Sequence, residues 1–148
     1  MKDVVIFDLD GTLALIEARR QMALRPNGKL DWDIFFDPEN IALDQPNDAV
    51  INMFKMLKSQ GYEMMILSGR DARSLDETTV WLHAHGIFFD GLIMRPKGSY
   101  TPDDVLKKTW LDGIGADRVF CVFDDRDKVV QMWRDNGLTC FQVAPGNF

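Results

Sequence analysis

Cysteine, histidine and long apolar runs are scarce in this sequence, and each scarcity narrows what the protein can be. The two cysteines, Cys121 and Cys140, lack the paired spacing of a metal site, so we expect two buried thiols. The two histidines, His83 and His85, are spaced wrongly to share a helix face, and we assign them no catalytic role. No apolar run approaches the ~20 residues that cross a bilayer, and no signal-peptide pattern opens the chain, so we expect a cytosolic protein that does not enter membranes.

The composition is that of an ordinary globular protein. Apolar residues fill 46% of the 148 positions and charged residues 27%, which suits a single domain over residues 1–148 with a sizeable core. The formal net charge of −6 argues weakly against strong non-specific binding to nucleic acid, although a local basic patch can dominate a site. Catalytic carboxylates that await a cation would account for part of this charge.

Short apolar runs alternate with amphipathic stretches, which is the pattern of a parallel sheet covered by helices. The expected strands are residues 4–7, 64–67, 92–94, 119–123 and 141–143. The fold class is therefore α/β, a Rossmann-like sandwich in one domain.

Helices are expected in the connections between these strands. Apolar residues recur at helical spacing before Gly61 and before Gly137, and each glycine is placed to end its helix. Two other helices carry start signals. Ser74 and Glu77 have capping-box spacing, and Thr101 offers a hydroxyl cap to the helix that follows it.

The segment from residue 15 to residue 46 shows neither the alternating apolar pattern of strands nor the apolar spacing of helices. A connection this long in a small domain is usually functional or disordered, and its aromatic residues argue against disorder. Because it holds few strong helix signals, we expect a flap or small lid rather than a full cap domain. Trp32 falls in this segment, facing the presumed active rim. By contrast, Trp81, Trp110 and Trp133 sit at helical positions and are expected to pack in or near the core.

Polar side chains follow three of the expected strands at their carboxyl ends, where open parallel sheets bind ligands. They are Asp8 and Asp10 after the first strand, Ser68 and Arg70 after the second, and Asp124 and Asp125 after the fourth. Four carboxylates converging at one rim would repel one another and raise one another's pKa values. A hard cation relieves that repulsion, and oxygen ligands of this kind suit Mg²⁺.

The segment from Asp8 to Thr12 has the residue types that phosphoryl transfer needs. Asp8 and Asp10 share a face in a continuing strand, and Gly11 lets the backbone turn sharply after them. A carboxylate that attacks phosphorus gives an aspartyl-phosphate, which a second acid helps to form and water then hydrolyses. Thr12 can donate a hydrogen bond to an incoming phosphate.

These motifs resemble the four signatures of haloacid dehalogenase (HAD) phosphatases. The matching segments, in order along the chain, are Asp8-Leu9-Asp10-Gly11-Thr12-Leu13, then Ser68, then Lys107 (with Lys108 as the alternative register), then Asp124-Asp125. The resemblance implies a HAD-type fold with little or no cap and a Mg²⁺-dependent phosphatase.

A narrower resemblance covers nearly the whole chain. Ser68-Gly69-Arg70 and residues 103–107, 124–134 and 142–148 are similar to the 3′-phosphatase domain of bacteriophage polynucleotide kinase/phosphatase. The likeness is weaker between Arg20 and Asp44, and residues 98–102 lack the charged residues that the phage enzyme carries there. No Gly-x-x-x-x-Gly-Lys-Ser/Thr phosphate loop is present, so we expect no kinase domain in this chain.

This resemblance implies catalytic roles for four residues. Asp8 is implied as the nucleophile and Asp10 as the general acid/base. Ser68 and Lys107 are implied to bind and neutralise the transferring phosphoryl oxygens.

The resemblance also implies ligands for the metal and the substrate. Mg²⁺ would be held by Asp8, the backbone carbonyl of Asp10, and one or both of Asp124 and Asp125. The residues implied to engage the substrate or its phosphate are Thr12, Arg19, Arg70 and Asp103.

Simpler explanations stay open for several of these residues. Ser68 could cap a turn, Asp103 could be only a first-turn helix acid, Lys107 could be a solvated lysine, and Arg19 a surface charge. Three function classes follow: a phosphatase on nucleic-acid 3′ ends or nucleoside 3′-monophosphates, a phosphatase on free 5′-nucleotides or another small phosphomonoester, and a non-catalytic binding module. A binding module has no need of two acids at the end of the first strand. The sequence leaves the oligomeric state open.

Overall fold

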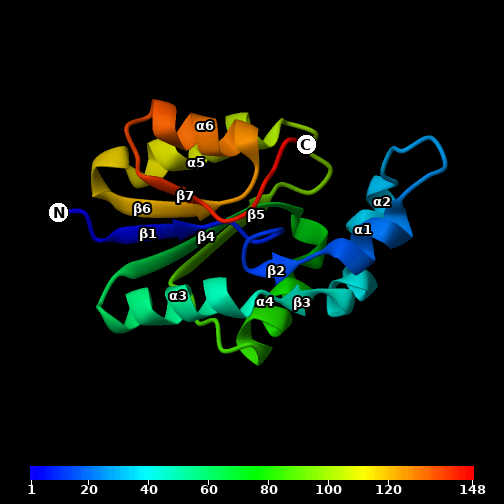
Figure 1. Cartoon of the computed structure of the whole chain (residues 1–148), viewed down its shortest axis with the longest axis horizontal. Coiled ribbons are helices and arrows are strands. Elements are labelled where there is room, and N and C mark those ends of the chain that lie inside the picture. The colour runs from blue at the N-terminus through cyan, green and yellow to red at the C-terminus, as the bar shows by residue number, and fades with distance from the viewer.

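The computed structural model describes all residues, Met1–Phe148, and its centre is a five-stranded sheet with helices on both faces (Figure 1). The strands of this sheet are β1 (Val4–Phe7), β4 (Glu63–Asp71), β5 (Gly91–Arg95), β6 (Val119–Asp124) and β7 (Cys140–Gln142). Their order is β5-β4-β1-β6-β7, and every neighbouring pair is parallel. The α/β fold predicted from the alternating pattern is confirmed.

Two helices cover each face of the sheet, as Figure 1 shows. On one face lie α3 (Asp48–Ser59) and α4 (Leu75–Ala84), and on the other lie α5 (Asp103–Ile114) and α6 (Asp127–Asp135). Two 3₁₀ turns, η2 (Ala72–Ser74) and η3 (Ala116–Arg118), precede α4 and β6.

The central strand β1 contributes side chains to both hydrophobic cores. Its side chains alternate between the two faces of the sheet, as strand geometry requires. Phe7 packs with Phe54 of α3, whereas Ile6 belongs to the cluster around Trp133 of α6. All four side chains of β1 are fully buried, which explains why this strand reads as a continuous apolar run.

The segment that lacked a clear period forms a small subdomain at one end of the sheet (Figure 1). Its ends pair as a short antiparallel ribbon of β2 (Ala14–Leu15) and β3 (Gln45–Pro46). Between them lie α1 (Glu17–Ala23), α2 (Trp32–Phe35) and the 3₁₀ helix η1 (Pro38–Leu43). It is more helical than expected, because helices of four to seven residues are too short to display a periodic pattern.

Three local expectations were wrong. Strand β4 does not end before Ser68 but continues to Asp71. The Ser74 hydroxyl forms no capping box, because the preceding 3₁₀ turn brings it to the carbonyl of Asp71, to which it donates at 3.1 Å. Helix α5 is preceded by Pro102 as the N-cap residue, without the side-chain cap expected from Thr101.

The expectation of two buried, unpaired thiols is confirmed for Cys121 and Cys140. None of the helices combines the length and the apolar character that crossing a membrane requires.

The packing of α3 on the sheet gives a prediction about stability. Phe54 is fully buried with its ring centroid 5.1 Å from that of Phe7, so Phe54→Ala should lower the free energy of unfolding by about 3–5 kcal/mol. Met56→Ala, on the exposed side of the same helix, should change it by less than ~0.5 kcal/mol. Urea unfolding of both variants tests this, and equal losses in the two would contradict the assigned core.

Candidate active site

The carboxyl ends of the central strands open into one pocket. Because the strand order reverses on either side of β1, the chain that leaves β1 enters a crevice between β4 and β6. A pocket of about 500 Å³ lies there, within the size range of small-ligand sites. Among the residues that line this strand-end pocket are Asp8, Asp10, Arg70, Asp103, Lys107, Asp124 and Asp125.

Asp8 is held from two sides. It is only 6% exposed, and Lys107 Nζ lies 2.7 Å from its Oδ1 atom while the Thr12 hydroxyl donates to its Oδ2 atom at 3.0 Å. Lys107, not the alternative Lys108, therefore reaches the site, since Lys108 pairs with Asp112 on the exposed face of α5. The Thr12 hydroxyl, expected to meet a phosphate, is instead engaged with Asp8 and orients its carboxylate.

Asp124 lies at the end of β6 and is bonded on both oxygens. Its Oδ2 atom accepts hydrogen bonds from Lys107 Nζ and from the indole N–H of Trp133, both at 3.1 Å. Its Oδ1 atom accepts the backbone N–H groups of Asp125 at 2.8 Å and of Arg126 at 3.4 Å. The carboxylate of Asp125, by contrast, is paired with no arginine or lysine, and its hydrogen-bond partners are the Asp8 carboxyl and its own backbone N–H.

Asp8, Asp124 and Asp125 form a buried cluster whose oxygens lie within 4.8 Å of one another. Burial raises the pKa of Asp8 well above its usual range, and the charge of Asp124 adds to this while Lys107 opposes it. Burial also raises the pKa of Asp125 to about 6. Carboxylates crowded in this way are short of positive charge, because the single ammonium of Lys107 faces three of them.

The cluster fits a small divalent cation. Mg²⁺ binds oxygens at about 2.1 Å, so opposite ligands lie about 4.2 Å apart, and this spacing needs only small side-chain movements here. The donor set is entirely oxygen, which is the set that Mg²⁺ prefers.

Gly11 lies beside this cluster, where there is no room for a side chain. Gly11 has a φ of +81°, and a Cβ atom built on it would lie 2.1 Å from Oδ2 of Asp125. Any larger residue would therefore strain the backbone and displace the carboxylate of Asp125.

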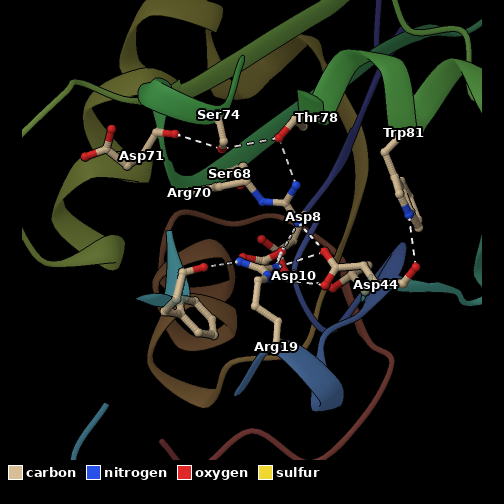
Figure 2. Close-up of polar contacts among 12 residues, drawn as sticks. Asp8, Asp10, Arg19, Asp44, Ser68, Arg70, Asp71, Ser74, Thr78 and Trp81 are labelled. Atoms are coloured by element: carbon tan, nitrogen blue, oxygen red, sulfur yellow. Dashed lines mark hydrogen bonds and ion pairs between the residues drawn. The ribbon is translucent and has the colours of Figure 1, made fainter. Parts of the chain in front are cut away.

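Asp10 lies in a separate ionic cluster, shown in Figure 2. Its Oδ1 atom accepts a hydrogen bond from Arg19 Nη2 at 2.8 Å and another from Arg70 Nη2. Both guanidinium groups also bind the carboxylate of Asp44, at 3.0 Å in each contact. Burial would raise the pKa of Asp10, but the two arginines overcome it and lower that pKa to about 2.

Arg19 is not a surface charge. Its side chain is fully buried, and its remaining guanidinium contact donates from Nη1 to the carbonyl of Phe35 at 3.0 Å. In this structure it holds Asp10 in place rather than lining the strand-end pocket. Arg70 does line that pocket, and its Nε atom is buried without a protein acceptor.

Asp44 was missed by the sequence analysis. It lies in the irregular segment just before β3, and no motif marks it. It is 3% exposed, it bridges both arginines, and its backbone carbonyl accepts the indole N–H of Trp81 at 3.1 Å. Only the folded chain brings it to Asp10, because its contact with Arg70 spans 26 residues.

Ser68 is buried in the sheet, whereas Asp103 lines the pocket. Ser68 is 1% exposed in β4, and its Oγ atom accepts the backbone N–H of Arg70 at 3.0 Å. Asp103, at the start of α5, lines the pocket and accepts hydrogen bonds from Arg95 and, at 3.0 Å, from Arg126. These two arginines also line the pocket, although no sequence motif predicted a role for either of them there.

Comparisons with known proteins agree with this geometry. Residues 2–148 match the family model of the polynucleotide kinase PNKP phosphatase domain. The chain is 32% identical over 149 residues to a protein of Autographa californica nuclear polyhedrosis virus that is assigned as a bifunctional polynucleotide kinase/RNA ligase. That alignment covers 95% of this chain and 19% of the viral protein.

Solved structures give the same result. A chain of the Pnkp1/Rnl/Hen1 RNA repair complex superposes with a TM-score of 0.79 and 34% identity, over 98% of this chain and 43% of that one. A phosphatase predicted in Clostridium acetobutylicum, 13% identical, shares the fold with a TM-score of 0.74 over 96% of this chain and 84% of that one. The chain spans less than half the length of the polynucleotide-kinase relatives. Matched along almost its whole length, the protein belongs to the PNKP phosphatase-domain family of HAD phosphatases.

Proposed function

We propose that the protein removes phosphate from the 3′ ends of nucleic acids, or from nucleoside 3′-monophosphates, through an aspartyl-phosphate at Asp8. The observation that carries this proposal is the position of the Asp8 carboxylate at the strand-end pocket. It lies against Lys107 and the Asp124–Asp125 pair, with the second acid Asp10 two residues further along the chain.

The first step forms a bond between an Asp8 carboxylate oxygen and phosphorus while the bond from phosphorus to the leaving 3′ oxygen breaks. The Thr12 hydroxyl keeps the Asp8 carboxylate in one orientation, and Lys107 balances negative charge on the phosphoryl oxygens. Asp10 gives a proton to the leaving oxygen. In the second step Asp10 takes a proton from the water that attacks phosphorus, and the Asp8 carboxylate is released with inorganic phosphate.

Asp8, Asp125 and Asp124, with the backbone carbonyl of Asp10, would hold Mg²⁺. Bound there, the ion supplies positive charge to the phosphoryl oxygens and to the crowded carboxylates. Asp125 is the better candidate for a direct ligand, because the oxygens of Asp124 already accept four protein hydrogen bonds.

The walls of the strand-end pocket support a substrate with several negative charges. Basic side chains line it despite the net charge of −6, and they are Arg20, Arg70, Arg73, Arg95, Lys107, Arg126 and Lys128. Arg70 would contact the phosphate, since it lines the pocket and its Nε has no protein partner. Ser68 is given the same role from the motif resemblance alone. The likeness to a chain of an RNA repair complex supports a polynucleotide end over a free 5′-nucleotide or sugar phosphate. A cytosolic location is in keeping with two unpaired thiols.

The first prediction concerns the nucleophile. Asp8→Asn should fold and yet lose turnover, because an amide cannot form the phosphoenzyme. Asp10→Asn should slow the reaction by about 10²–10⁴-fold through lost proton transfer. Phosphate release is the measurement, and Asp112→Asn, the same change on an exposed helix face, should leave the rate unchanged. Folded Asp8→Asn protein that keeps an appreciable share of the wild-type rate would contradict a nucleophilic role for Asp8.

The second prediction concerns the metal. EDTA should abolish activity and Mg²⁺ should restore it, whereas the larger Ca²⁺ should substitute poorly. Mg²⁺ should also raise the melting temperature of the protein, since it binds the folded state alone. This rise should vanish in Asp125→Asn. Full activity in chelator, or an unchanged melting shift in that variant, would contradict the proposed ligands.

The third prediction concerns the substrate. 3′-Phosphorylated oligonucleotides should be hydrolysed in preference to 5′-phosphorylated ones in a parallel assay. If several phosphates are bound, kcat/KM on oligonucleotides should fall steeply with added salt, while hydrolysis of a 3′-mononucleotide should depend on salt much less. A clear preference for 5′-monophosphates or a sugar phosphate would overturn the assigned substrate and leave the chemistry at Asp8 intact.

A further inference from the structure

The short helix α2 and its C-cap residue carry three aromatic side chains, which divide between core and surface. Phe35 is 6% exposed, and the guanidinium of Arg19 lies 4.5 Å from its ring centroid. Trp32 is 51% exposed, and the Phe36 ring stacks on it with centroids 5.6 Å apart and an interplanar angle of 22°. All three residues line the strand-end pocket. A large exposed aromatic side chain at a ligand pocket calls for an explanation beyond packing.

Trp32 differs from the buried tryptophans of the chain. Trp81 and Trp133 each donate the indole N–H to a buried acceptor, Trp81 to Asp44 and Trp133 to Asp124. The indole of Trp32 makes no hydrogen bond to the protein, and its ring is supported by stacking on Phe36 while half of its surface faces solvent. Rings supported in this way are the usual platforms for bases of single-stranded nucleic acid.

The position of α2 is coupled to the acid Asp10. The same Arg19 guanidinium donates to the carbonyl of Phe35 at 3.0 Å and to Asp10 at 2.8 Å. A second contact joins Asp33 of α2 to Arg73 of η2 at 3.6 Å. The Trp32 ring therefore has a defined place relative to the reacting groups, as a group that positions one end of a substrate must have.

Building on the proposed 3′-phosphatase function, we propose that Trp32 is a stacking platform for a base among the last two nucleotides of the 3′-phosphorylated strand. The indole would take any base, because every base has a π face. Arg20 and Arg73, which line the same pocket, would lie near the backbone of that strand. Trp32 thus contributes to substrate binding and takes no part in proton or phosphoryl transfer.

The experiment compares Trp32→Ala, Trp32→Phe and the control Phe88→Ala. Phe88 is another exposed ring, 55% exposed and stacked on His83, but it does not line the pocket. On a 3′-phosphorylated oligonucleotide, Trp32→Ala should raise KM by about 5- to 150-fold with little change in kcat, as expected for the loss of one stacked base. Trp32→Phe should retain most of the wild-type KM, and Phe88→Ala should match wild type.

Base-free substrates separate stacking from a structural role. Wild-type protein should show a raised KM on oligonucleotides whose last two 3′ nucleotides are abasic, and Trp32→Ala should add little to that rise. Glycerol 2-phosphate, a secondary phosphomonoester without a ring, should be hydrolysed at equal rates by all variants. The abasic comparison needs no variant, so it remains decisive even where Trp32→Ala folds poorly.

The possible failures are distinguishable. Wild-type protein that hydrolyses 3′ ends with the same KM whether or not the last bases are present would overturn the platform and leave the 3′-phosphatase function standing. Equal losses of Trp32→Ala on oligonucleotide, abasic oligonucleotide and glycerol 2-phosphate would also overturn it, because that pattern marks a structural role. Wild-type protein inactive on every 3′-phosphorylated end would overturn both the proposed function and the platform.

Discussion

Negative charge crowded at the end of a buried sheet is the constraint on which the rest of this structure depends. The order of the strands brings Asp8, Asp10, Asp124 and Asp125 to one pocket, and none of these carboxylates is freely hydrated. Buried charge is costly unless it is paired and hydrogen-bonded. The chain separates the problem into two parts. Asp10 shares two arginines with Asp44, so the charges in its cluster balance, whereas the other three carboxylates share Lys107 and remain short of positive charge.

This separation gives two acids only two residues apart opposite electrostatic environments. The pKa of Asp8 is raised by burial, whereas that of Asp10 falls to about 2 because of its arginines. If Asp10 is the proton donor of the proposed mechanism, its pKa must rise before it can donate, and a bound phosphate would raise it in two ways. Its negative charge raises the pKa of the neighbouring acid, and it competes with Asp10 for the Arg70 guanidinium. In the proposed mechanism, proton donation by Asp10 would therefore be favoured when substrate is bound.

The sequence predicted the parts of the molecule that local pattern determines. The apolar run of β1 and the acids that follow it are contiguous, and the rule that parallel strands end at one rim predicted Asp124 beside Asp8, where the structure has it. Lys107, which lies on a helix, was predicted only from the family resemblance, and it contacts Asp8. Helix start signals were less informative. The Ser74 hydroxyl donates to the carbonyl of Asp71 and makes no capping hydrogen bond to the helix that follows it. Asp44 could not be found, since its importance lies in contacts with two arginines that are 25 and 26 residues away. The burial of Arg19 could not be predicted for the same reason, because it depends on the subdomain that folds over it.

The subdomain of residues 14–46 has two kinds of residue under different constraints. Arg19 near its start and Asp44 near its end meet at Arg70, and removing any member would leave buried charge uncompensated, at a cost of about 3–5 kcal/mol. The residues between them meet no such penalty. Their packing holds α2 at the pocket, and the ring of Trp32 contacts the Phe35 and Phe36 rings while half of its surface stays exposed. The stretch where the resemblance to the phage enzyme weakens is this intervening stretch. The electrostatic constraint therefore falls on the two ends of the subdomain and not on the exposed side chains between them.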